Sequence, residues 1–154
     1  MSTFIKVKRV HPDAVLPSQD SGDVGWDLTA VEGGFIPPMQ VRIVPTGWIL
    51  AEHPYDDDPH KKILLKIEGR SGLAMKHSVF PVGGIIDPSY RGEIGVMLYN
   101  GGERPYQFEK GDRVAQIVIY SVHGKSLSSK TAFIESDSVF PSERGDKGFG
   151  SSGR

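Results

Sequence analysis

The chain has 154 residues, the size of one domain that can bury a core without help from disulfides or metals. It has no cysteine, which excludes disulfides, thiolate metal sites and cysteine nucleophiles and favours a cytoplasmic protein. Because 18 Lys and Arg residues nearly balance 19 Asp and Glu residues, general electrostatic binding to nucleic acid or to a membrane is not expected. No apolar run approaches the roughly 20 residues of a membrane span.

Glycine and proline divide the chain into many short segments, most of which favour strands. Alternating or dense apolar residues predict strands over residues 4–10, 63–67, 93–100 and 131–135, and another after a turn at 110–112. The run 41–50 reads as strands broken at Pro45 and Gly47. Only residues 71–77 combine helix propensity with a residue able to cap a helix. The sequence therefore predicts an all-β fold with one short helix.

Two polar side chains lie among apolar residues and are candidate ligand groups. Asp27 stands between Trp26 and Leu28, so we expect its carboxylate close to bulky apolar groups, although an Asp in a surface turn fits equally well. Gln116 interrupts the apolar strand that follows the turn at 110–112. A Gln in such a strand needs a partner, which is either the backbone or a ligand.

The segment around Arg70 suggests an anion site. Ser71 is placed to cap the short helix, whose free amides would lie beside the Arg70 guanidinium. Such a pair suits phosphate. The alternative is a plain helix cap next to a surface arginine.

The stretch GGIIDPSYRGE, residues 83–93, is the part of the chain that folding alone explains least well. Its glycines, Pro88 and Ser89 mark a tight reversal between two strand-like runs, which predicts a β-hairpin. Asp87 follows two isoleucines, and burial against them would desolvate its carboxylate and suit it to accept a proton. The alternative is an Asp that hydrogen-bonds the amides of its own turn.

Two strongly polar segments remain. Residues 51–62 contain three consecutive aspartates with His53 and His60, but the spacing matches no common metal-ligand pattern, and a hydrated loop is the main expectation. The tail 144–154 is rich in glycine and serine, which predicts disorder. Phe149 fits that prediction poorly, because a ring among glycine amides could stack on a nucleobase while the amides cradle a phosphate.

In this order, five segments resemble the motifs of the trimeric dUTPase family. They are VGWDL (24–28), GRSGLA (69–74), GGIIDPSYRGE (83–93), GDRVAQ (111–116) and RGDKGFGSSG (144–153). Each alone is weak, but their order and separations are specific, and the resemblance covers most of the chain. It implies a distorted jelly-roll β-barrel over residues 1–140 and a C-terminal arm over residues 141–154. In a homotrimer this arm would close the active site of a neighbouring subunit.

The same resemblance implies hydrolysis of dUTP to dUMP and pyrophosphate with Mg²⁺. Asp87 corresponds to the base that activates a water for attack on the α-phosphorus, and Tyr90 to the residue that packs on the deoxyribose. Main-chain groups of the 83–93 segment would read uracil, near Gly84, Ile86 and Gly95. A backbone template rejects a mismatched base because buried polar groups would be left unpaired.

The phosphates would be bound by residues of three motifs, with one further residue near the metal. The corresponding residues are Arg70, Ser71, Gly72 and Gln116, and in the arm Arg144 at the γ-phosphate with Gly150, Ser151 and Ser152. Phe149 corresponds to the ring that stacks on uracil. Asp27 would meet Mg²⁺ through water, because the ion keeps most of its waters and is held mainly by the triphosphate.

Three features depart from the family pattern. Pro81 stands where many members have Asn, so recognition of uracil would rely more on the backbone. Glu68 and Gly69 replace a frequent Pro, and the loop 53–61 looks longer than usual. Two alternatives remain open: a relative of dCTP deaminase, and a dUTPase-like protein that acts chiefly by binding a regulatory partner. The host is open too, and the protein could be encoded by a phage or virus.

Overall fold

The computed structural model describes residues 5–51 and 61–123. Three parts of the sequence analysis fall outside these residues: the expected strand at 131–135, the arm at 141–154 and nearly all of the polar segment 51–62. In chain order the elements are β1 (Val7–Arg9), β2 (Trp26–Thr29), β3 (Gly34–Ile36), β4 (Val41–Leu50), β5 (Lys61–Glu68), α1 (Ser71–His77), β6 (Val79–Pro81), β7 (Ile85–Ile86), β8 (Glu93–Asn100), β9 (Tyr106–Phe108) and β10 (Arg113–His123).

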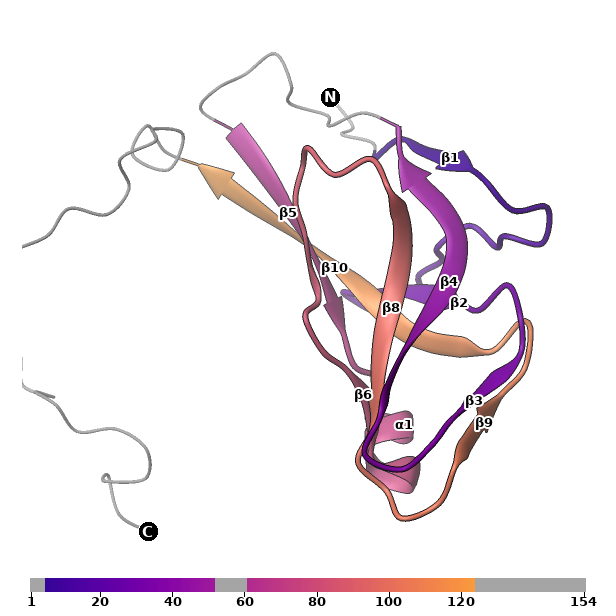
Figure 1. Cartoon of the computed structure of the whole chain (residues 1–154). Coiled ribbons are helices and arrows are strands. Elements are labelled where there is room, and N and C mark those ends of the chain that lie inside the picture. Colours follow the sequence, from indigo (N-terminus) through magenta and orange to yellow (C-terminus); the bar gives the residue numbers. More distant parts are fainter. Residues whose placement is uncertain (1–4, 52–60, 124–154) are drawn as a thin grey trace, which may run out of the picture.

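Two four-stranded antiparallel sheets face each other across the core (Figure 1). One sheet has the order β1-β4-β8-β6 and the other β2-β10-β5-β7, while β3 and β9 form a small third sheet. Buried side chains from both large sheets meet between them, among them Val44, Val96 and Leu98 from the first and Leu65 and Ile117 from the second. Two packed antiparallel sheets of this kind are a jelly roll, here distorted by the small sheet, and the all-β prediction is confirmed.

Strand β4 runs unbroken through Pro45 and Gly47, so the predicted break is wrong. The disturbance appears in its pairing with β8, whose register shifts between Pro45 and Ile49. Gly47 has φ +77, and a Cβ there would lie 2.6 Å from the Cβ of Ala14. The proline and the glycine therefore bend the strand without ending it.

The predicted hairpin in residues 83–93 is also wrong, because its two strands belong to different sheets. Strand β7 pairs with β5, whereas β8 pairs with β4 and β6. The strands that do pair across this segment are β6 and β8, with Phe80 opposite Tyr99. The segment between them thus leaves one sheet, adds two residues to the other and returns, which carries Asp87 to the edge between the sheets.

The short helix is confirmed, but its predicted cap is not. The N-cap of α1 is Arg70, with no side-chain capping bond, so Ser71 is the first helical residue. The helix ends at His77 and is capped by Ser78, which adopts the left-handed conformation (φ 54) and donates its N–H to the Ala74 carbonyl. Helix α1 lies at the opposite end of the molecule from β1, directly after β5 (Figure 1).

Candidate active site

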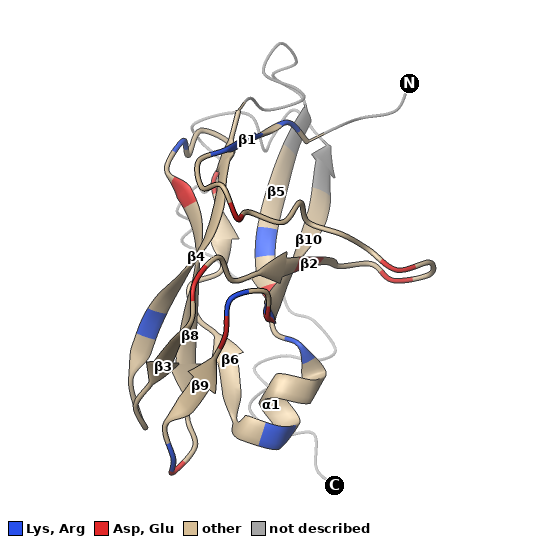
Figure 2. Ribbon diagram, turned by 90° about the vertical axis from the view of Figure 1, so that its right-hand side faces the viewer, with Lys and Arg blue, Asp and Glu red and all other residues tan. Residues whose placement is uncertain are grey.

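The first candidate pocket, about 510 Å³ in volume, lies between β2, β10, the end of β5 and the start of α1; we call it the arginine pocket. Charged segments of both signs meet in this region (Figure 2). Its lining includes Asp20, Asp23, Val24, Gly25, Asp27, Glu68, Arg70, Ser71, Gly72, Arg113, Gln116, Val118 and Tyr120. The structure thus brings together the candidate residues of three sequence motifs that are separated by about 40 residues or more along the chain.

Strand register aligns three polar residues in one row across this sheet. Gln116 on β10 is paired with Asp27 on β2 and with Glu68 on β5. Directly paired residues point to the same face of a sheet, and all three line the arginine pocket. The row is therefore fixed by the sheet and not by the loops.

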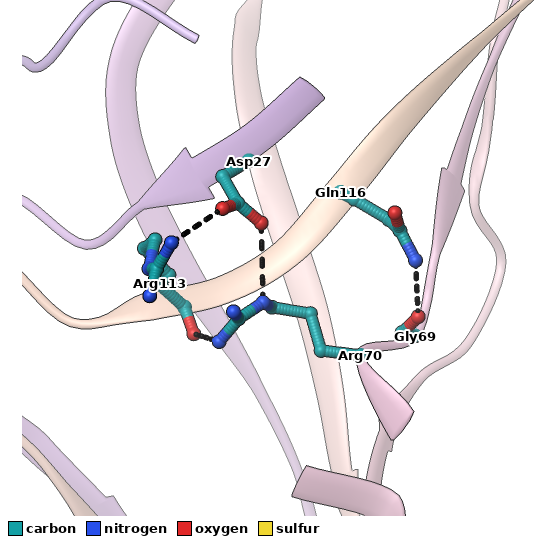
Figure 3. A network of polar contacts seen from close by, with 5 residues as sticks. All are labelled: Asp27, Gly69, Arg70, Arg113 and Gln116. Atoms are coloured by element: carbon teal, nitrogen blue, oxygen red, sulfur yellow. Dashed lines mark hydrogen bonds and ion pairs between the residues drawn. The ribbon is translucent and has the colours of Figure 1, made fainter. Parts of the chain in front are cut away.

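Asp27 is bound by two arginines (Figure 3). Its Oδ1 lies 3.1 Å from Arg70 Nε, and its Oδ2 accepts a hydrogen bond of 3.0 Å from Arg113. Arg70 also donates to the carbonyl of Arg113, at 3.2 Å. Asp27 lies in strand β2, so the alternative of an Asp in a surface turn is wrong. Its neighbours Trp26 and Leu28 point to the opposite face of the strand, while Val24 and Val118 line the pocket with it.

Gln116 has the backbone partner that its place in an apolar strand required. Its Nε2 donates to the carbonyl of Gly69 at 2.8 Å (Figure 3). The other side of the amide lies against Gly25, where a Cβ would be only 2.1 Å from Gln116 Oε1. Gly25 is thus required by the position of this side chain, and that requirement was not visible in the sequence.

Glu68 is paired as well. Its Oε1 lies 2.6 Å from Lys66 Nζ. This hydrogen bond and the charge of Glu68 raise the pKa of Lys66 above its ordinary value, so Lys66 stays protonated at neutral pH.

The donor set fits a metal only through water. Within residues 5–51 and 61–123, no three Asp, Glu or His side chains are grouped closely enough to hold an ion. Both oxygens of Asp27 already face arginines. An ion that arrives on a phosphorylated ligand and keeps its waters is compatible with this arrangement.

The second candidate pocket, about 240 Å³ in volume, lies beside the turn that follows β7; we call it the tyrosine pocket. It is lined by Ile43, Ile67, Gly83, Ile85, Ile86, Asp87, Tyr90, Glu93, Ile94, Gly95 and Met97. The lining is mostly apolar, yet Asp87 itself is exposed at its rim. A single chain therefore does not bury the Asp87 carboxylate, and the desolvation expected from the sequence is not found in it.

The turn that carries Asp87 is held by its own backbone. Tyr90 donates its N–H to the carbonyl of Asp87 at 3.0 Å, with Pro88 at the second turn position. Within the described part of the chain, the Asp87 carboxylate makes no hydrogen bond or ion pair. It does not bond the amides of its own turn, which was the alternative explanation for an Asp here, and it is free to contact a ligand.

Tyr90 is fixed beside this carboxylate. Its hydroxyl donates to the Glu93 carbonyl at 3.1 Å, while the side chain of Glu93 accepts from the Gly47 amide at 2.8 Å. A Cβ on Gly92 would lie 2.3 Å from the Tyr90 hydroxyl oxygen, so the glycine lets the ring fold back over the turn. Local contacts thus hold Tyr90, while the Glu93 side chain ties this end of β8 to β4.

The residues expected to read a base have different surroundings. Gly84 accepts from the Ile67 amide at 2.7 Å and has no room for a Cβ, which would lie 2.3 Å from the Ile67 carbonyl oxygen. Gly95 is paired with Pro45, which has no N–H to donate to it. Pro81 lies in the edge strand β6, where a missing donor is tolerated, and it lines neither pocket.

The two pockets share no lining residue. One chain therefore presents Arg70 and Asp27 in one place and Asp87 and Tyr90 in another. The arm candidates Arg144, Phe149, Gly150, Ser151 and Ser152 lie outside the described residues. Arg113 received no role in the sequence analysis, although it lies within the GDRVAQ segment, which was the signal that could have identified it.

In the described residues, no helix has the length and apolar content needed to cross a bilayer.

Together these features define a jelly-roll protein with a polar pocket in which two arginines hold Asp27 and, separate from it, a small apolar pocket edged by a carboxylate that has no hydrogen bond or ion pair in the described residues. The chain belongs to the dUTPase family, since a family model described as dUTPase matches residues 12–153.

Curated bacterial relatives agree with this assignment. The chain is 40% identical to the deoxyuridine 5'-triphosphate nucleotidohydrolase of Wolinella succinogenes, over 97% of this chain and 94% of the relative. It is 39% identical to the protein of the same description from Anaeromyxobacter sp. strain Fw109-5, over the full length of both.

Solved structures of phage dUTPases share the fold. A point mutant of the dUTPase of Staphylococcus bacteriophage 80alpha with dUpNHpp has a TM-score of 0.76 and 24% identity, covering 99% of this chain and all of that one. A point mutant of the dUTPase of S. aureus phage phi11, in which a structural Mg(II) ion is coordinated, has a TM-score of 0.70 and 19% identity, covering 90% and 99%.

Proposed function

We propose that the protein hydrolyses dUTP to dUMP and pyrophosphate. The observation that carries the proposal is Asp87, whose carboxylate makes no hydrogen bond or ion pair in the described chain and which lines the tyrosine pocket together with Tyr90. A carboxylate placed in this way can accept a proton from water. The names of the bacterial relatives and the dUpNHpp bound to the phage protein support dUTP as the substrate.

Asp87 acts as the general base in this proposal. It orients a water and takes its proton while the water oxygen bonds to the α-phosphorus. The bond from that phosphorus to the oxygen bridging to the β-phosphorus breaks, and pyrophosphate leaves. Because Asp87 is exposed in one chain, the substrate and a second subunit would supply the dry surroundings that favour proton transfer.

The arginine pocket binds the phosphates. Arg70 keeps a terminal nitrogen beyond its contacts with Asp27 and Arg113, and Ser71 and Gly72 offer amides of the first helical turn, which have no acceptor within the helix. Gln116 lies in the same pocket. When bound with the triphosphate, Mg²⁺ neutralises charge on the phosphate oxygens, and Asp27 would contact it through water.

The tyrosine pocket receives the nucleoside. Tyr90 packs against the deoxyribose and leaves no room for a 2′-hydroxyl. Main-chain groups near Gly84, Ile86 and Gly95 read uracil; the Gly95 carbonyl receives no hydrogen bond from Pro45, which supports this assignment. The side chain of Pro81 offers no hydrogen bond, so the backbone carries the discrimination against cytosine.

A complete site is shared between subunits of a homotrimer. The separation of the two pockets on one chain supports this, because residues that must meet one substrate line different cavities. The family match continues to residue 153, which supports an arm of residues 141–154 following a barrel of residues 1–140. In the arm, Phe149 would stack on uracil while Arg144, Gly150, Ser151 and Ser152 bind phosphates.

A cytoplasmic location is proposed with this activity. The bacterial origin of the curated relatives and the absence of cysteine support it. These relatives lend no support to a phage or viral origin.

The deciding experiment incubates the protein with Mg²⁺ and, separately, dUTP, dCTP, dTTP and UTP, and measures pyrophosphate and deaminated products. We expect only dUTP to be consumed at an appreciable rate. Deamination of dCTP would replace the proposal with the deaminase alternative, and no turnover of any of the four would overturn it.

The arm is tested separately by ending the chain before Arg144. Turnover of dUTP should nearly vanish, while size-exclusion chromatography coupled to light scattering still reports a trimer. Retained turnover would contradict the role of the arm, and dissociation of the trimer would show that these residues act in assembly.

A further inference from the structure

Arg113 lies in the arginine pocket but has no role in the proposal above. Its side chain is half exposed, at 52%, whereas those of Arg70 and Asp27 are 32% and 21% exposed. Arg113 donates to Oδ2 of Asp27, and Arg70 contacts Oδ1. Each carboxylate oxygen is thus held by a different arginine, which fixes the plane of the carboxylate (Figure 3).

An irregularity in β10 brings Arg113 to this face of the sheet. The register against β2 shifts between Arg113 and Ala115, so two steps on β10 match one step on β2. Val114 and Ala115 are consecutive and both buried, which breaks the alternation of a regular strand. Residues three apart would otherwise face opposite sides, yet Arg113 and Gln116 both line the arginine pocket. A bulge that re-aims a side chain beside a site is a recognised device.

Arg70 is held at two points by its neighbours. Its Nε contacts Asp27, and one terminal nitrogen donates to the Arg113 carbonyl. Arg113 therefore reaches Arg70 by two routes, through its backbone and, by way of Asp27, through its side chain. The two arginines and Asp27 by themselves carry a net charge of +1, while Asp20, Asp23 and Glu68 also line the pocket and Glu68 is paired with Lys66.

We propose that Arg113 is a positioning residue: its side chain holds Asp27, and Asp27 in turn holds the Arg70 guanidinium in the orientation that receives the terminal phosphates. This inference rests on the proposed function and adds to it a residue that acts through another. A guanidinium fixed before binding loses less freedom when the ligand arrives. A direct contact between the Arg113 side chain and the phosphate is the competing role.

A double-mutant cycle separates the two roles. In the wild-type background, Arg113→Ala should weaken binding of dUpNHpp about 3- to 5-fold, and Arg113→Lys, which keeps one contact to Asp27, about 2-fold, as expected for a partly exposed ion pair. In an Asp27→Ala background, Arg113→Ala should add less than about 2-fold, because the route through Asp27 is gone. Binding is measured by isothermal titration calorimetry.

Two controls accompany the cycle. Lys110→Ala removes a cation from the same turn, where Lys110 pairs with Asp13 at 3.2 Å outside both pockets, and should leave binding unchanged. Affinity for dUMP, which lacks the terminal phosphates, should change less than about 2-fold in Arg113→Ala, since a positioning defect is confined to the phosphates. If Arg113→Ala weakened the binding of dUMP as much as that of dUpNHpp, the substitution would have damaged the fold in general, and the inference would be overturned.

The remaining outcomes are equally clear. A loss from Arg113→Ala that is the same in both backgrounds would assign Arg113 to direct phosphate contact, and no loss in either would remove it from the site. If the wild-type protein neither binds dUpNHpp nor hydrolyses dUTP, the proposed function fails. The cycle is then measured with inorganic triphosphate, so that failure of the proposed function is distinguished from failure of the positioning role of Arg113.

Discussion

The arginine pocket and the tyrosine pocket are built in opposite ways. In the arginine pocket, side chains from β2, β10 and the start of α1 bind one another, with Asp27 between two arginines and Gln116 on the Gly69 carbonyl. In the tyrosine pocket, a turn closed by one backbone hydrogen bond carries Asp87, whose carboxylate is left without a partner in the described chain. Within the described residues, Asp27 is paired with two arginines in the first pocket, whereas Asp87 has no ion pair in the second.

This difference suggests a division of labour. Paired arginines are oriented before a ligand binds, which suits recognition of a charged group that stays the same throughout a reaction. A carboxylate without partners can change its protonation state without breaking internal bonds, which suits the chemical step. Variants of the two pockets should therefore fail in different measurements.

The largest effect is expected from Asp87→Asn. It removes the proton acceptor but keeps the shape, so kcat for dUTP should fall by about 10²- to 10⁴-fold while Kd for dUpNHpp changes less than about 2-fold. Asp13→Asn is the matched control, because this exposed carboxylate lies outside both pockets. Near-normal turnover of Asp87→Asn would refute the assignment of the base.

Next in size is Arg70→Ala, which should weaken dUpNHpp binding by about 10- to 100-fold, as expected for the loss of charge-assisted hydrogen bonds. Titration calorimetry measures it, and Lys76→Ala in the last turn of the same helix should have no effect. An equal loss of dUMP affinity would show that the two pockets do not divide the substrate as proposed.

A smaller effect is expected from Gly25→Ala. The new Cβ would displace the Gln116 amide from the Gly69 carbonyl, so triphosphate affinity should fall by about 3- to 10-fold, the value of one neutral hydrogen bond. In a Gln116→Ala background, Gly25→Ala should not lower triphosphate affinity any further. If Gly25→Ala still lowers triphosphate affinity in that background, Gly25 acts through its backbone and not by leaving room for the Gln116 amide.

The smallest effect is expected from Tyr90→Phe, which deletes the hydroxyl bond to Glu93 but keeps the ring. Because Tyr90 is 47% exposed, its hydroxyl hydrogen bond contributes little, and the preference for dUTP over UTP in kcat/KM should fall about 2- to 3-fold. Binding of inorganic triphosphate should not change. A change there would contradict the separation of the two pockets.

The sequence was most informative where local pattern and burial agree. The dense apolar run 63–67 lies within the central strand β5, and the helix at 71–77 is where its propensity predicted. The need of Gln116 for a partner followed from its apolar neighbours, and the carbonyl of Gly69 meets it. The five motif segments identified the family, which the match to residues 12–153 confirms.

Other features depend on contacts between distant segments. The Ile85–Ile86 strand joins β5 and not its neighbour β8, because pairing is decided by which edge is open in the folded sheets. Asp27 faces arginines because strand alternation turns its apolar neighbours away from it. The two isoleucines before Asp87 predicted a buried carboxylate, but Asp87 is exposed in the folded chain.

The sequence by itself determined that this is an all-β chain of the dUTPase family, since strand periodicity and motif order are local properties. Only the tertiary structure decided how the motifs are grouped. Cross-strand register placed Gln116 between Asp27 and Glu68, and a one-residue irregularity in β10 turned Arg113 to the same face. Register is set by many simultaneous contacts across a sheet, so no single segment of the sequence contains it.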